Sequence, residues 1–164
     1  MIRPARLALA LLALAASPVL AREALGIFGA WGVFRDADTA RCYAIAVARP
    51  STKSRDFQPY AGVAWWPRAQ VRGQVHFRLS RKLQPGAPIQ LSIGGQRIAL
   101  TGGSADAWAS DKRGDAAIMA AMRSAGEMTV SARGTNGQSF SNTWTLDGAA
   151  TAMDAAAVAC ARVK

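Results

Sequence analysis

The sequence predicts an α+β fold, with a mostly antiparallel sheet or sandwich of about eight strands and two helices in the C-terminal third. Short runs of alternating apolar residues, separated by glycine and proline turns, recur between residues 25 and 146. Two other stretches have helical spacing, one ending near Gly126 and one following Gly148. Because there is no internal repeat, low-complexity tract or linker, residues 22–164 are expected to form a single domain.

Residues 1–21 are predicted to be a secretory signal peptide. Arg3 and Arg6 precede an apolar run over residues 7–16, and Ala21 closes a small-residue site of the kind that signal peptidase cleaves. The alternative is a membrane anchor, but this run is too short to cross about 30 Å of hydrocarbon. We therefore expect cleavage after Ala21 and export to the periplasm or out of the cell, with outer-membrane association as a further expectation.

The first two-thirds of the domain is predicted to be strands and turns. The strand candidates are residues 25–34, 42–47, 60–66, 74–80 and a hairpin over 89–100 that turns at Gly94-Gly95. The loop over residues 50–59 should be solvated. Alternation in the fourth candidate places Val75, Phe77 and Leu79 on one face and His76, Arg78 and Ser80 on the other, which should face water.

The last third is predicted to be helix, hairpin, helix. Asp111 or Asp115 can cap the first helix, and Gly126 stands where a left-handed stop is expected. Its apolar positions are Ile118, Met119 and Met122. Strands over residues 128–132 and 140–146 flank the turn dipeptide Asn136-Gly137. After Gly148 a stripe of small residues, Ala149, Met153, Ala156 and Cys160, predicts a closely packed helix.

The chain has two cysteines, Cys42 and Cys160. Export places both in an oxidising compartment, where an even count favours a disulfide, and only one intramolecular pairing exists. The alternatives are free or metal-bound thiols. A metal site needs more ligands than two distant cysteines and one histidine supply, so a bridge is the favoured interpretation.

The sequence shows no catalytic constellation, and neither a cofactor nor a metal is expected. His76 is the one histidine, and an exposed, unremarkable imidazole is its default interpretation. A Ser/His/Asp triad would need distant partners without a Gly-x-Ser-x-Gly motif. The carboxylates of Asp106, Asp111 and Asp115 lack the spacing of a calcium loop, and helix capping explains them more simply.

The sequence supports two predictions about the tryptophans. Trp31, Trp108 and Trp144 are predicted to be structural, because each lies in an apolar strand or at a junction between elements. Trp65 and Trp66 are neighbours on one strand, so only one of them can enter the same core. The other is either covered by a helix or loop or available for binding.

Five short motifs follow one another between about Phe28 and Cys160. They are Phe28-Gly29-Ala30-Trp31, Cys42-Tyr43, Ala107-Trp108-Ala109, Arg133-Gly134-Thr135, and Trp144-Thr145-Leu146-Asp147-Gly148. Their order resembles that in the invasion-associated locus B family of exported proteobacterial proteins. The resemblance implies a periplasmic or outer-membrane-associated protein with a role in invasion of host cells. Usual members carry more cysteines, so the chain resembles a divergent branch.

Three classes of function remain: a non-enzymatic envelope protein that binds a partner or surface, a small periplasmic hydrolase, and a nucleic-acid binder. The resemblance favours the first. The scarcity of histidine and of paired carboxylates disfavours the second, and export disfavours the third. The expected partner is an unknown protein or an anionic envelope surface, and peripheral membrane association is one expected mode of binding.

The positive charge lies in the middle of the chain. No Asp or Glu occurs from Phe57 to Ala105, where six basic residues lie. Those six are Arg68, Arg72, Arg78, Arg81, Lys82 and Arg97. The first five are the candidate residues for binding an anionic surface such as lipid head groups, lipopolysaccharide or an acidic protein. The alternative is a solvated face that serves solubility.

Overall fold

The computed structural model describes residues 22–161, so the predicted signal peptide lies outside the described residues. The strands are β1 (Glu23–Phe28), β2 (Trp31–Asp36), β3 (Arg41–Val47), β4 (Tyr60–Trp66), β5 (Val71–Arg78), β6 (Ile89–Ile93), β7 (Gln96–Gly103), β8 (Asp106–Trp108), β9 (Glu127–Arg133) and β10 (Ser139–Thr145). The helices are η1 (Pro67–Ala69), α1 (Lys112–Met122) and α2 (Ala149–Ala161). The predicted α+β class is confirmed.

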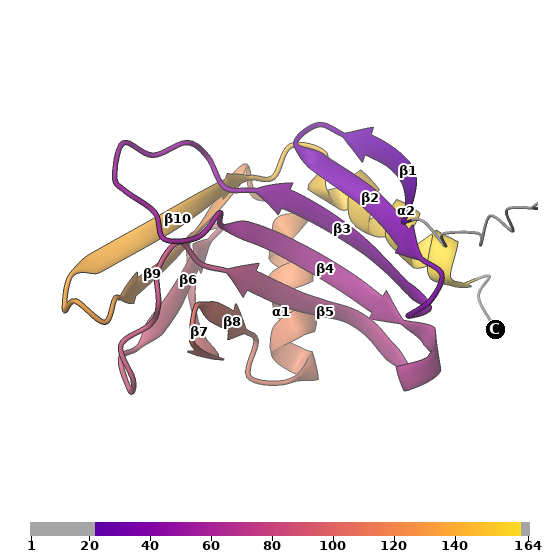
Figure 1. Ribbon diagram of the computed structural model, residues 1–164. Coiled ribbons are helices and arrows are strands. Elements are labelled where there is room, and N and C mark those ends of the chain that lie inside the picture. Colours follow the sequence, from indigo (N-terminus) through magenta and orange to yellow (C-terminus); the bar gives the residue numbers. More distant parts are fainter. Residues whose placement is uncertain (1–21, 162–164) are drawn as a thin grey trace, which may run out of the picture.

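The described strands form one antiparallel sheet in the order β1-β2-β3-β4-β5-β8-β7-β6-β9-β10. The sheet bends along β7, whose first five residues pair with β6 and whose last three residues pair with β8. The bend folds the sheet into two layers, with β1 to β5 in one and β6, β9 and β10 in the other (Figure 1). Across the core between them, the rings of Phe77 and Trp144 lie 5.5 Å apart between centroids.

Within residues 22–161 the sheet has ten strands, two more than the sequence predicts. The segment expected as one strand over residues 25–34 is two, β1 and β2, divided at Gly29-Ala30. Gly29 has a φ of +54°, and a Cβ there would lie 2.5 Å from the carbonyl oxygen of Asp147. The close approach of a distant segment therefore sets this turn. The other extra strand is the three-residue β8, for which no element was predicted.

Helix α1 begins as predicted and ends differently. The carboxylate of Asp111 caps it by accepting a hydrogen bond from the N–H of Gly114 at 2.8 Å. Asp115 instead accepts from the backbone N–H of Val75 at 2.8 Å and so ties α1 to β5. The predicted left-handed stop at Gly126 is wrong. The helix ends at Met122 with a right-handed cap at Arg123, and Gly126 is not among the positive-φ glycines.

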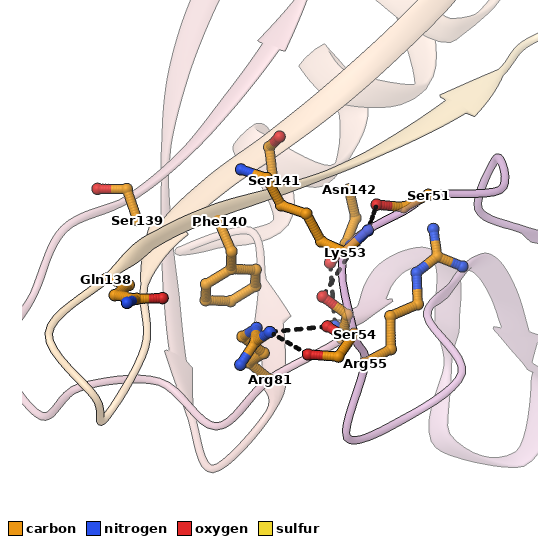
Figure 2. Close-up of a pocket in the computed structure, with 11 residues that line it drawn as sticks. Ser51, Lys53, Ser54, Arg55, Arg81, Gln138, Ser139, Phe140, Ser141 and Asn142 are labelled. Atoms are coloured by element: carbon orange, nitrogen blue, oxygen red, sulfur yellow. Dashed lines mark hydrogen bonds between the residues drawn. The ribbon is translucent and has the colours of Figure 1, made fainter.

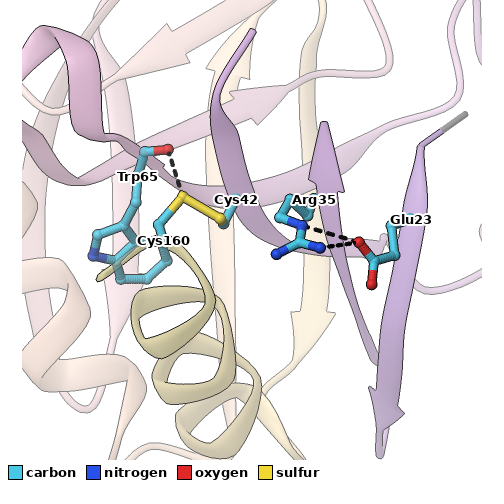
Figure 3. Close-up of a disulfide and its surroundings, with 5 residues drawn as sticks. All are labelled: Glu23, Arg35, Cys42, Trp65 and Cys160. Carbon is cyan, nitrogen blue, oxygen red and sulfur yellow. Dashed lines mark hydrogen bonds and ion pairs between the residues drawn. A yellow bond between two sulfur atoms is a disulfide. The ribbon is translucent and has the colours of Figure 1, made fainter. Parts of the chain in front are cut away.

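Helix α2 packs on the core side of β2 and β3, and a disulfide fixes its last turn (Figures 1 and 3). Cys42 of β3 and Cys160 of α2 are bonded across 118 residues of sequence, with their Cα atoms 5.6 Å apart. The predicted bridge is therefore present. Figure 3 also shows the carbonyl of Trp65 beside the Cys160 sulfur at 3.7 Å and the ion pair between Arg35 and Glu23 on the neighbouring strands.

The buried face of each helix matches the predicted stripe. Ile118 and Met122 of α1 are buried, and the third predicted position, Met119, is half-buried against the core. In α2 the buried residues are Ala149, Ala152, Met153, Ala156 and Cys160. Within residues 22–161, neither helix has the length and apolar character needed to cross a bilayer.

Candidate anion-binding site

A polar pocket of about 460 Å³ opens where three segments far apart in the sequence meet (Figure 2). The first is the long loop between β3 and β4, the second is the chain directly after β5, and the third is the start of β10. Its lining residues are Ser51, Lys53, Ser54, Arg55, Ser80, Arg81, Gln138, Ser139, Phe140, Ser141 and Asn142. No carboxylate is in this set.

A buried polar pair fixes the back of the pocket. The side-chain oxygen of Asn142 accepts from the N–H of Ser80, and its amide nitrogen donates to the Ser80 hydroxyl, each at 3.0 Å. The carbonyl of Ser80 accepts from the N–H groups of Asp56 and Phe57 at 2.9 and 3.2 Å. These bonds hold β10, the end of β5 and the β3–β4 loop together. The expectation that Ser80 faces water is wrong, since it is only 4% exposed.

Three cationic side chains surround this frame. Arg81 donates from Nη2 to the carbonyl and the hydroxyl of Ser54, at 2.7 and 3.0 Å, which holds the guanidinium against the loop. Arg55 donates to the carbonyl of Arg49. Lys53 lies in a short turn closed by a bond from its own N–H to the Ser51 hydroxyl at 3.1 Å. Within the part of the chain that the structure describes, none of these three cations forms an ion pair with a carboxylate.

The five basic residues predicted from the sequence lie in two groups, with one residue apart from both. Arg81 lines the pocket and Lys82 follows it with an exposed side chain. Arg68 in η1 and Arg72 in β5 are exposed at the opposite end of β5. Arg78 is engaged elsewhere, since it pairs with Asp106 at 2.6 Å and lies over the ring of Phe57 at 4.4 Å.

The candidate residues predicted from the sequence do not include Lys53 and Arg55. Both lie just before the acid-free stretch that begins at Phe57, within the same loop. The available signal was the alternation of Ser51, Lys53, Ser54 and Arg55, in which hydroxyl and cationic groups are interleaved. Local sequence gives no indication that this loop meets the chain after β5.

The default interpretation of His76 as an unremarkable exposed imidazole is wrong. Its Nε2 lies 2.9 Å from Asp106 Oδ1. The ring stacks on Trp108 with 5.1 Å between centroids and meets the edge of Tyr60 at 5.6 Å. The histidine is therefore held on three sides by side chains of β4 and β8.

The pocket has the chemistry of anion binding. Serine hydroxyls and the Gln138 amide can donate hydrogen bonds to an oxyanion, and the three cations supply charge. His76 is not among the lining residues, so no serine there has a histidine base beside it. Among residues 22–161 no three His, Cys, Asp or Glu side chains converge in a group suited to a metal ion.

Comparison with known proteins gives no relative: no family model, curated protein or solved structure matches the chain.

Proposed function

We propose that the chain is an exported, non-enzymatic envelope protein of the invasion-associated locus B type that binds an anionic surface or partner through the basic pocket. The observation that supports it most is the convergence of Lys53, Arg55 and Arg81 on one serine-lined pocket with no lining carboxylate. The order of motifs and the predicted signal peptide support the envelope location, in the periplasm or at the outer membrane. Contact with a host cell is a proposed role of the same surface.

The physical basis is the charge and the donors of the pocket. A cation near an anionic membrane surface contributes about 1 kcal/mol, so Lys53, Arg55, Arg81 and the neighbouring Lys82 together supply a useful attraction. Such attraction acts within a Debye length of about 8 Å at physiological salt, so it should weaken as salt rises. Peripheral association, with the acyl chains left in the bilayer, follows from a pocket lined mainly by polar side chains.

Vesicle co-sedimentation tests the proposal with matched variants. Lys53→Ser with Arg81→Ser removes two charges at the pocket, and Arg68→Ser with Arg72→Ser removes two at the other end of β5. We expect wild type and the second variant to prefer anionic over neutral vesicles at low salt, and the first variant to lose most of that preference. Equal binding by both variants, or no preference in wild type, would contradict the proposal.

A small periplasmic hydrolase is the second candidate, and the His76–Asp106 contact favours it. A carboxylate that orients an imidazole is part of known hydrolytic triads. The neighbouring groove described below offers His76 no Ser, Thr or Cys among its lining residues. A hydrolase screen tests this candidate: activity that is present in wild type and lost in His76→Ala would establish it.

A further inference from the structure

A second depression lies on the outer face of β3, β4 and β5 and shares no lining residue with the basic pocket. It is a groove of about 450 Å³. It is lined by Arg22, Arg41, Tyr43, Tyr60, Trp66, Trp108 and His76 around a floor that includes Gly62 and Ala64. Five of these side chains are aromatic, counting the imidazole.

The alternation of strand residues builds this groove. On β4, the outward positions are Tyr60, Gly62, Ala64 and Trp66, so two small residues lie between two large rings. Gly62 is opposite His76 on β5, and His76 is opposite Trp108 on β8. The small side chains therefore leave a depression at the centre of the sheet face, and aromatic side chains surround it.

Trp108 is the exposed ring of the groove. Unlike Trp31 and Trp144, it does not close the core, so that part of the structural prediction is wrong for this residue. Trp31 and Trp144 are fully buried, whereas Trp108 is 36% exposed. Its ring stacks on His76 with planes inclined by 22°, and the Asp106 carboxylate holds that imidazole through Nε2. The tryptophan is thus supported by the imidazole and available to a ligand on the exposed part of its surface.

The opposite wall carries charge. Arg41 lies over the rings of Tyr43 and Trp66 at 4.3 and 5.0 Å. Arg22 and Arg41 both pair with Asp36, so two cations share one carboxylate and leave an excess of one positive charge. The other cation near the groove, Arg78, is neutralised by Asp106. Trp66 is half-buried beneath Arg41, and Trp65 packs against the core.

We propose that this groove binds an acidic saccharide. A sugar ring has an apolar C–H face, which packs on an aromatic ring, and a hydroxyl edge, which needs polar partners. Trp108 and Tyr60 supply the rings, and Gln74 and the arginines supply donors at the rim. The excess positive charge of Arg22 and Arg41 is complementary to a sugar carboxylate or phosphate.

Other ligand classes fit the groove less well. Single-stranded nucleic acid needs a row of cations that follows its backbone, and the groove has one uncompensated charge. A peptide added as a strand needs a free sheet edge, whereas the groove lies on the face of strands that are paired on both sides. This inference concerns a site separate from the basic pocket and does not rest on the proposed membrane function.

Ligand-observed NMR with defined probes tests the inference. The acidic probes are trigalacturonic acid, which carries carboxylates, and deacylated lipopolysaccharide core, which also carries phosphate; the trimethyl ester of trigalacturonic acid is the uncharged control. We expect saturation transfer to at least one acidic probe and weaker transfer to the ester. The difference between the two acidic probes identifies the acidic group that is bound.

Two variants locate the binding. Gly62→Leu fills the floor, and its Cβ would meet only the Ala44 carbonyl oxygen, at 3.4 Å, so the fold should tolerate it. We expect Gly62→Leu to abolish binding and Trp108→Ala to weaken it at least about tenfold. Arg22→Gln should weaken the acidic probes only, with the exposed Arg97→Gln as the control for charge.

The inference is overturned if neither acidic probe binds wild type, or if Gly62→Leu, confirmed as folded by circular dichroism, binds as well as wild type. Preferential binding of oligothymidylate or of a polyproline peptide would also overturn it, since the groove would then belong to another ligand class. Vesicle binding by the groove variants should be unchanged, which separates this inference from the proposed function.

Discussion

Asn142 and Ser80 are joined by two hydrogen bonds across 62 residues of sequence, and both side chains are almost completely buried. The pair connects β10 to the end of β5 behind the basic pocket. A buried amide in the middle of a strand is costly unless its donors and acceptors are used, and here the partner supplies an N–H and a hydroxyl oxygen. The geometry of the pocket therefore depends on a structural polar contact.

Replacing Asn142 by leucine should destabilise the fold by about 1–3 kcal/mol, because the Ser80 N–H loses its acceptor inside the core. Urea unfolding of wild type and variant measures the change. The exposed Asn136→Leu is a control, although its side chain also accepts one local turn bond, from Gln138. If Asn142→Leu unfolds at the same urea concentration as wild type, the buried pair is not structural.

Gly148 should tolerate no side chain. A Cβ there would lie 1.9 Å from the carbonyl oxygen of Phe28, and its φ is +80°. Gly137 has a similar φ of +76°, but a Cβ added to it would meet nothing within 4 Å, so it isolates the backbone effect. We expect Gly137→Ala to cost about 1 kcal/mol and Gly148→Ala considerably more. If thermal unfolding shows that the two variants lose the same stability, the contact with Phe28 is unimportant.

The disulfide should appear as a mass difference of two hydrogens between the unreduced and the reduced protein. Removing it by Cys42→Ala with Cys160→Ala should lower the free energy of unfolding by about 4–5 kcal/mol on the chain-entropy model, because the bridge closes a very long loop. Two titratable thiols in protein isolated under oxidising conditions would contradict the assignment.

Asp115 gives the fold a defined pH dependence. Burial raises the pKa of its carboxyl, the N–H of Val75 opposes that rise, and nearby Asp111 adds to it. Because the pKa is higher in the folded state than in the unfolded chain, protonation of Asp115 favours the folded state. This contribution to the free energy of unfolding is complete below the pKa of the unfolded chain, about 3.9, and is lost as the pH rises through the folded-state pKa. Asp115→Asn keeps an acceptor for Val75 and should remove this loss. Parallel pH–stability curves for wild type and variant would contradict it.

The sequence predicted the strands and helices that depend on short-range residue patterns. Alternating residues located β6, β7, β9 and β10, and helical spacing located α1 and α2. The turn at Gly29 was missed because its cause is contact with Asp147, which is far away in the sequence. Gly29 and Gly148 belong to segments that are far apart in the sequence and lie against one another in the fold. The Trp31 indole also donates to the carbonyl of Thr145, at 3.1 Å.

The candidate sites were less predictable than the strands. Alternation correctly placed His76 on the outer face, but it does not show that the Trp108 ring stacks on it. Ser80 was predicted to face water because the alternation of apolar and polar residues continues past the end of β5. At that point the chain turns, and Asn142 covers Ser80. The basic pocket needs three segments to meet, so the charge pattern of the sequence identified only Arg81 of its three cations, together with the neighbouring Lys82.

The most direct test of the proposed anion binding is an amide NMR titration of the labelled protein with glycerol 3-phosphate, a soluble phospholipid head-group analogue. We expect saturable shifts confined to residues 51–55, 80–82 and 138–142, and their loss in the variant that combines Lys53→Ser with Arg81→Ser. The Arg68→Ser, Arg72→Ser variant should titrate like wild type. Absence of shifts in those segments, or shifts centred on residues 68–72, would contradict anion binding at the basic pocket.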